Sequence, residues 1–286
     1  MTIEPRVIRR RKPKWQRVSP FGYAMLIFVA LLSVFPFYWM FVVASQTTAA
    51  ISSPTPVLIP GGRFFTVIKH VYDVIPFNAA LLNTTIVGLT VAVAQVFFSA
   101  LAGFAFAKLN FRGSKFMILF VIGTMMLPSQ LGIIELFLLV SQLGWQDSLL
   151  ALIVPALVTA FGVFWMRQVV DAQVPNELLE AASIDGAGVM RIYWNIVLPI
   201  IRQSGFVLGL FSFLASWNDF LWPSLVLQSP GHFTVQVAVQ QLKANYVIDY
   251  SLNLGGAFMA TAPLLLLFVF VGRRLVSGVM DGAVKG

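Results

Sequence analysis

Residues 21–43 read FGYAMLIFVALLSVFPFYWMFVV, and this apolar run has the length needed to cross a membrane. A helix needs about 20 mostly apolar residues to span the hydrocarbon core of a bilayer. The run lies inside a stretch, residues 18–62, that carries no charged side chain. It is too long for a signal peptide, and no small-residue cleavage site clearly ends it. The stretch therefore predicts a transmembrane helix.

Five more runs of this kind follow along the chain. They are residues 80–106, 116–134, 148–166, 203–218 (extendable to 227) and 250–272. The whole chain of 286 residues is 58% hydrophobic and only 10% charged, whereas a water-soluble domain carries about 25% charged residues. We therefore expect an all-α integral membrane protein, with a basic tail at 1–20 and a single six-helix domain at 21–286.

The basic residues predict the orientation of these helices. Six spans place both termini on one side, and sixteen of the 19 Lys and Arg residues fall on that side. Loops rich in Lys and Arg stay in the cytoplasm, so both termini are expected to be cytoplasmic. The net charge of +8 is then mainly a signal of how the chain is oriented in the lipid membrane, and no nucleic-acid partner is expected.

The longest loop on that side contains a distinctive pattern. Residues 175–199, hereafter the 175–199 loop, read PNELLEAASIDGAGVMRIYWNIVLP. Pro175 favours the start of a short helix, Gly186 permits a turn, and Asp185 could cap a second helix that begins at 186 or 187. Pro199 is expected to end that second helix. A helix–turn–helix that is apolar on one face indicates docking with a partner.

The order Glu180-Ala181-Ala182, Gly186 and Ile196-x-Leu198-Pro199 resembles the EAA loop of the membrane permeases of binding-protein-dependent ABC importers. This resemblance implies the type I ABC importer permease fold and a coupling helix that sits in a groove of a separate ATPase. The residues that it implies for coupling are Glu180, Ala181, Ala182, Asp185, Gly186, Ala187, Leu198 and Pro199.

Two further stretches, 216–223 and 282–286, resemble the smaller, six-span permease of the carbohydrate (maltose-type) branch. The resemblance implies a bacterial or archaeal inner-membrane location and a carbohydrate cargo, with glycerol phosphate or another polar solute as the alternative. It also implies three kinds of partner: a homologous second permease, two ATPase subunits and an extracytoplasmic binding protein.

Several kinds of chemistry are not expected of this chain. It has no G-x-x-x-x-G-K-[ST] P-loop, so ATP and Mg would be used by the partner ATPase. It has no cysteine and two histidines, which excludes thiol catalysis and makes a metal site improbable. We expect no cofactor and no enzymatic activity in the chain itself. A secondary transporter is the weaker alternative, because the spans hold almost no charge that could couple an ion.

Six polar or aromatic residues in or near the spans are candidates for a substrate path. They are Trp217, Asn218, Asp219, Trp222, Asn83 and Gln130. Aromatic rings stack on sugar faces, while amides and carboxylates bind hydroxyl groups. The alternative for this cluster is a pair of interfacial aromatic residues with a polar cap at the helix end, and it is as good as the substrate role for Trp217 and Asn218. Asn83 could equally join helices. Asp219 favours a functional or inter-subunit role, because a carboxylate within a membrane is costly.

Overall fold

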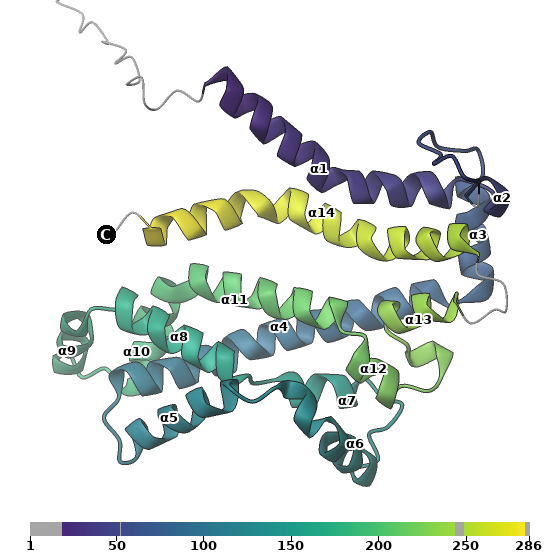
Figure 1. Ribbon diagram of the computed structural model, residues 1–286. Helices are drawn as coiled ribbons and strands as arrows, with labels where there is room; N and C mark the ends of the chain where they lie inside the picture. Colours follow the sequence, from purple (N-terminus) through teal and green to yellow (C-terminus); the bar gives the residue numbers. More distant parts are fainter. Residues whose placement is uncertain (1–18, 52, 244–248, 284–286) are drawn as a thin grey trace, which may run out of the picture.

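A computed structural model of the chain describes residues 19–51, 53–243 and 249–283, and in these residues all regular structure is helical (Figure 1). The predicted basic tail, apart from its last two residues, and the final residues 284–286 lie outside the described residues. The elements are α1 (Pro20–Ala44), α2 (Thr48–Ile51), α3 (Phe64–Val74), α4 (Phe77–Lys108), α5 (Ser114–Met125), η2 (Ser129–Gly132), α6 (Ile133–Gln142), α7 (Leu150–Ile153), η3 (Val154–Ala156), α8 (Ala160–Gln173), α9 (Asn176–Ile184), α10 (Val189–Ile192), η4 (Tyr193–Val197), α11 (Leu198–Asn218), α12 (Leu221–Val226), η5 (Pro230–His232), α13 (Val235–Gln241) and α14 (Tyr250–Ala283).

The predicted all-α membrane architecture is confirmed, with one correction to the spans. Within the described residues, five helical stretches are long and apolar enough to cross a bilayer: Pro20–Ala44, Phe77–Lys108, Leu150–Gln173, Val189–Asn218 and Tyr250–Gly272. The third predicted span, 116–134, is not one straight helix. Its first half is α5, and the chain then bends by 87° into η2 and α6.

Pro128 explains where the third span breaks. It lies at the bend between α5 and α6, just before η2. Proline lacks an N–H group and pushes the residue before it out of helical geometry, so α5 ends three residues earlier at Met125. The bent pair makes a sixth crossing only if both halves are counted together.

Helices α4, α8 and α11 form the centre of the molecule, with α5 beside α8. Small residues allow these helices to approach closely. A Cβ atom built on Gly103 of α4 would lie 2.7 Å from the backbone nitrogen of Arg167 in α8. Gly209 of α11 similarly faces Val96 of α4, with 3.1 Å between the built Cβ and the nearest side-chain carbon. Both helices that flank α4 thus approach it closely at a glycine.

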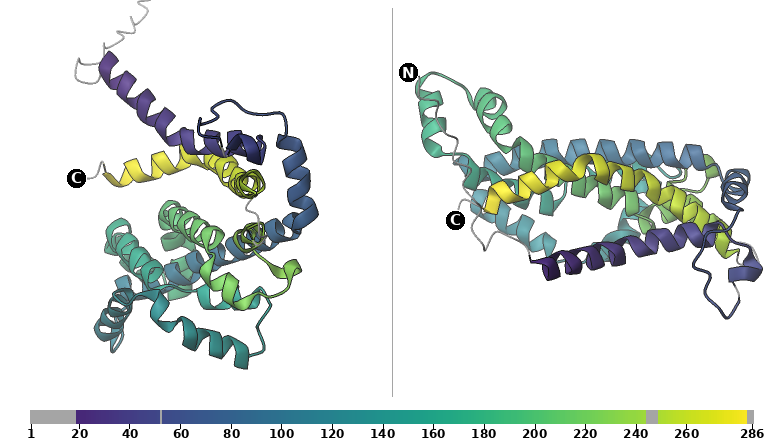
Figure 2. Two further views of the ribbon diagram at one scale, coloured as in Figure 1. Left: turned by 45° about the vertical axis from the view of Figure 1, so that its right-hand side comes forward. Right: turned by 90° about the horizontal axis from the view of Figure 1, so that it is seen from above.

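Helices α1 and α14 pack on each other along one side of this bundle (Figure 2). Most side chains of α1 are exposed, including Phe21 at 79% and Leu31 at 66%. Such a continuous apolar face is unfavourable in water, so it fits a helix that meets lipid or another membrane subunit. Both α1 and α14 continue through internal prolines, Pro36 and Pro263.

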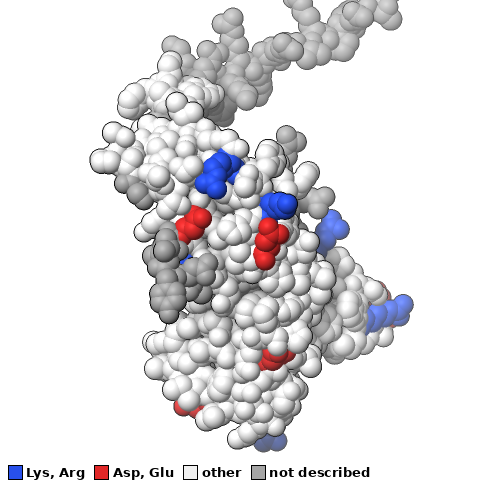
Figure 3. Space-filling view, turned by 90° about the vertical axis from the view of Figure 1, so that its right-hand side faces the viewer, with Lys and Arg blue, Asp and Glu red and all other residues white. Residues whose placement is uncertain are grey.

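The two ends of the bundle differ in what they carry. One end holds α9 and α10, together with the start of α1 and the end of α14 (Figure 1). The opposite end holds α2, α3, α12 and α13. Figure 3 views that second end, where a few acidic and basic side chains are scattered over a mostly uncharged surface.

Candidate coupling loop and transport cavity

The first half of the 175–199 loop is helix α9, which projects from the end of the bundle (Figure 1). None of its side chains is buried, and the apolar side chains of Ile184 and Leu178 are 85% and 47% exposed. Glu177 lies in its first turn, where a negative charge complements the helix dipole. An apolar face this exposed at a helix tip is suited to bind another protein surface.

A Schellman-type turn ends α9, and Gly186 makes it possible. Gly186 has a φ of +79°, which favours glycine. Its N–H donates to the Ser183 carbonyl, and the Ala187 N–H donates to the Ala182 carbonyl over 2.9 Å. The expectation that Asp185 caps a second helix is wrong. Asp185 is the C-cap of α9, because the left-handed turn at Gly186 ends this helix and the next one starts only at Val189, after the extended Gly188.

The second half of the loop is anchored rather than projecting. It begins at Val189 after Gly188 and is continuous with α11, so Val189–Asn218 forms one stretch of 30 residues. The expectation that Pro199 ends this helix is therefore wrong. A π-helical turn, Tyr193–Val197, ends two residues before Pro199. Such a turn inserts one extra residue, so the helix continues in spite of the proline.

Buried side chains fix this second half to the bundle. Tyr193 and Val197 are fully buried and share a core with Met166 of α8 and Phe104 of α4. The rings of Phe104 and Tyr193 lie 5.7 Å apart. A movement of this second half of the loop would therefore displace α4 and α8 directly.

The residues of the predicted coupling motif divide between these two environments. Ala182, Ala187 and Leu198 are half-buried against the inner core, so their small or apolar side chains serve packing. The remaining motif residues are exposed: Glu180, Ala181, Asp185, Gly186 and Pro199.

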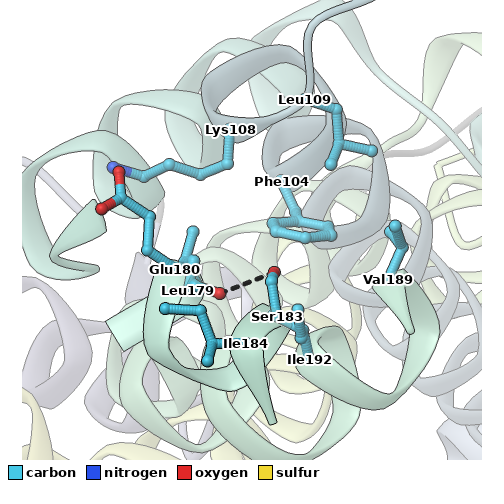
Figure 4. A pocket seen from close by; sticks show the side chains of 9 residues that line it. All are labelled: Phe104, Lys108, Leu109, Leu179, Glu180, Ser183, Ile184, Val189 and Ile192. Carbon is cyan, nitrogen blue, oxygen red and sulfur yellow. Dashed lines mark hydrogen bonds between the residues drawn. The ribbon is translucent and has the colours of Figure 1, made fainter. Parts of the chain in front are cut away.

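A groove of about 520 Å³ separates α9 from the end of α4 (Figure 4). Its walls are largely apolar, from Phe104 and Leu109 on one side and Leu179 and Ile184 on the other. The Glu180 carboxylate points toward the Lys108 ammonium at its rim (Figure 4). This groove is hereafter called the α9 groove.

A second, larger hollow lies among α4, α6, α8, α11 and α12. This central cavity has a volume of about 920 Å³. Amide, hydroxyl and aromatic side chains line it together with one carboxylate and many apolar groups, and the described lining residues include no Lys or Arg. The polar and aromatic lining residues are Gln95, Gln130, Thr159, Phe161, Phe211, Ser212, Ser216, Asn218, Asp219, Trp222 and Thr234.

Four of the six predicted path residues line this cavity: Gln130, Asn218, Asp219 and Trp222. The Trp222 indole N–H donates to the Ala151 carbonyl over 2.9 Å, which fixes the ring at the cavity wall. The structure thus brings together residues separated by about ninety positions in the sequence.

The other two predicted path residues lie elsewhere. Trp217 is 3% exposed, and its indole N–H donates to the Ala260 carbonyl of α14 over 3.3 Å. Asn83 donates to the carbonyls of Gly231 and Phe233 over 2.9 and 3.1 Å. Trp217 therefore joins α11 to α14, and Asn83 joins α4 to the η5 segment. Neither is among the residues that line the cavity.

Gln95 is a further cavity residue, which the sequence, as for Asn83, leaves open between joining helices and meeting substrate. Its amide nitrogen donates to the Ala156 carbonyl over 2.9 Å, and its oxygen accepts a hydrogen bond from Ser212 over 2.5 Å. One side chain of α4 thus joins η3 and α11 across the cavity wall. The sequence feature that marks it is an uncharged polar residue within an apolar span, but its partners are 61 and 117 positions away.

At the opposite end from α9, Asp147 holds two loops together. Its carboxylate accepts hydrogen bonds from the backbone N–H groups of Gln228 and Ser229 over 2.8 Å, and His232 Nδ1 lies 3.2 Å away. Burial raises the pKa of this carboxyl, but the hydrogen bonds from Ser229, Gln228 and His232 together hold the pKa well below its ordinary value. The group is therefore a stable anionic cross-link.

Known proteins resemble this chain in sequence. Residues 95–276 match the family model described as "Binding-protein-dependent transport system inner membrane component". The chain is 30% identical to the arabinooligosaccharides transport system permease protein AraQ of Halalkalibacterium halodurans, over 97% of this chain and 99% of that protein. It is also 30% identical to the lactose transport system permease protein LacG of Rhizobium radiobacter, over 97% and 98%.

A third relative transports a different kind of solute, according to its name. The sn-glycerol-3-phosphate transport system permease protein UgpE of Yersinia pestis is 30% identical, over 91% of this chain and 95% of that protein. Among solved structures, a chain in the crystal structure of a bacterial ABC transporter involved in the import of the acidic polysaccharide alginate superposes with a TM-score of 0.76. That match covers 88% of this chain and 94% of that one at 20% identity, so it concerns the fold.

Proposed function

Because the chain belongs to the family of binding-protein-dependent transport system inner membrane components and is a permease subunit of an ABC importer, we propose that it forms half of a carbohydrate path. In this proposal the 175–199 loop receives the movement of an ATPase and the central cavity conducts the solute. The family implies an ATPase and a solute-binding protein as partners. The chain is a multi-pass membrane protein.

The observation that carries the coupling role is the division of the 175–199 loop. Helix α9 has no buried side chain, while the segment after Gly188 is packed into the core of the bundle. A partner that binds α9 would therefore pull on α10 and α11 through a short turn. The exposed apolar side chain of Ile184 would enter the ATPase surface.

The lining of the central cavity favours a neutral, polyhydroxylated cargo over a phosphate ester. Hydroxyl groups are matched by the amides of Gln130 and Asn218 and by the Asp219 carboxylate. A phosphate is usually bound by Arg, Lys or helix N-termini, and the described lining residues contain neither Arg nor Lys. The sugar-related names of two relatives, AraQ and LacG, support the same choice.

The remaining arrangement is proposed on the same basis. A second, homologous permease would complete the cavity, and two ATPase subunits would use ATP and Mg below it. The start of α1 and the end of α14 lie at the same end as α9 (Figure 1), which supports cytoplasmic termini and a cytoplasmic ATPase. The chain itself would carry out no covalent chemistry, in a bacterial or archaeal inner membrane.

Co-purification and uptake test the proposal together. The tagged chain is expected to bring down an ATPase from the native membrane, and the reconstituted importer should take up a neutral saccharide faster than glycerol phosphate. I184D should abolish ATPase recovery because it places a charge in the apolar contact. The matched change I59D, at an apolar side chain that is 76% exposed in the loop between α2 and α3 and lies outside the spans, should leave recovery intact. Recovery of the ATPase by I184D at the wild-type level would refute the docking role.

A further inference from the structure

We propose that Lys108 is a positioning residue that joins α9 to α4, so that both move as one unit during transport; this rests on the proposed coupling role of α9. Lys108 is in the last turn of α4, and its side chain is only 6% exposed. A positive charge there complements the negative end of the helix dipole. Its ammonium group is directed toward α9 across the α9 groove (Figure 4).

The partners of Lys108 come from two other elements. Its Nζ donates to Asn176 Oδ1, at the start of α9, over 2.8 Å. Asp171 Oδ1 of α8 lies 4.0 Å away, and the Glu180 carboxylate of α9 points toward the same ammonium (Figure 4). One lysine of α4 thus joins α9, through Asn176, and lies beside the Asp171 carboxylate of α8 at this end of the bundle.

The physical reason for joint movement is the cost of a desolvated charge. An ammonium group withdrawn from water is tolerated only while hydrogen bonds and opposite charges compensate it. If α9 moved away from α4 by more than about 1 Å, the hydrogen bond to Asn176 would exceed ordinary hydrogen-bond length. Helix α4 therefore has to follow α9, or the lysine loses its nearest partner.

Helix α4 is suited to carry this movement to the other end of the protein. It is a single helix of 32 residues, roughly 48 Å long at 1.5 Å per residue. Gln95 at its middle binds η3 and α11 at the central cavity. Thr84 near its far end accepts the N–H of Val235 over 2.7 Å. A displacement at Lys108 is thereby coupled to the cavity wall and to α13.

The test measures solute uptake per ATP hydrolysed by the complete importer in proteoliposomes. K108M and N176L are each expected to lower this ratio about tenfold, the value of one hydrogen bond to a charged group, while ATP hydrolysis continues. K108R should restore most of the ratio, since it keeps the charge and the donor. K115M, a charge removal at an exposed lysine of α5, is the matched control and should behave as wild type.

Each other outcome overturns the inference. An unchanged ratio in K108M and N176L would show that α9 and α4 are not joined through this contact. Failure of both variants to assemble would show that the contact serves folding only. A wild-type importer that neither hydrolyses ATP nor takes up solute would instead refute the proposed function, so the two failures are distinguishable. The double variant should be no worse than either single variant, because both remove the same interaction.

Discussion

The close approach of the α4 and α8 backbones at Gly103 allows a quantitative prediction for G103A. A methyl group added at Gly103 would lie 2.7 Å from the backbone nitrogen of Arg167 and 2.7 Å from the Met166 carbonyl carbon. Ordinary carbon contacts are about 3.5–4.0 Å, so α8 has to shift by roughly 0.8 Å or more. The obstacle is backbone, which cannot rotate away as a side chain could.

The control is Gly123 in α5, where an added Cβ meets nothing within 4 Å. Both glycines are inside helices, so alanine gains about 1 kcal/mol of helix propensity at either position. The difference between G103A and G123A therefore isolates the overpacking cost, about 1–3 kcal/mol. At about 2–4 °C per kcal/mol, G103A should melt roughly 2–12 °C below G123A.

The assay is thermal denaturation of the purified protein in detergent, followed by the loss of monodisperse material on size exclusion after heating. G123A should melt at or slightly above the wild-type temperature. If G103A melts at or above G123A, the close backbone approach of α4 and α8 is wrong. In that case the coupling of α4 to the 175–199 loop through Met166 and Phe104 would also lose its basis.

Three further predictions concern single residues. G186A should destabilise the turn after α9 by about 1–2 kcal/mol, because Gly186 has a φ of +79°, and solute uptake should fall. The control G188A, at a residue with a φ of −70°, should transport normally. Equal uptake by both variants would contradict the role given to the left-handed turn. The stability that Asp147 gives to its two loops should be constant from pH 8 to pH 5 and decline only below the ordinary pKa of 3.8, because the pKa of Asp147 is lowered in the folded protein. The measurement compares the rates of proteolysis of wild type and D147N across this pH range. Loss of the difference between the two rates near pH 6 would refute the prediction. W217F should lower the melting temperature, since it removes a hydrogen bond to Ala260, but leave the KM for solute unchanged; a raised KM would place Trp217 in the path after all.

The membrane architecture could be predicted from the sequence because it depends on local composition. Apolar runs of sufficient length have few alternatives to helices in lipid, and five of the six predicted runs are straight or nearly continuous spans. The third run is long enough to span a bilayer, but it is not a straight span, because Pro128 introduces a bend of 87°. Pro128 marks where the bend lies, but its angle depends on what α6 packs against, which composition does not specify.

The candidate sites divide in the same way. The 175–199 loop was identified from the spacing of its own residues, and Gly186 takes the left-handed conformation that this spacing requires. The roles of Asp185 and Pro199 were predicted wrongly, because the register of the second helix is set by the burial of Tyr193 and Val197 against α4 and α8.

What the sequence by itself determined is the set of properties that one segment carries alone: membrane insertion, the helical spans and the turn after α9. What only the tertiary structure decided is which polar side chains meet. Trp217 and Trp222 are five positions apart, yet one joins α11 to α14 and the other lines the central cavity. Lys108 and Asn176 are 68 positions apart and form one contact. The physical reason is that a desolvated polar group takes its partner from whichever segment packing brings near.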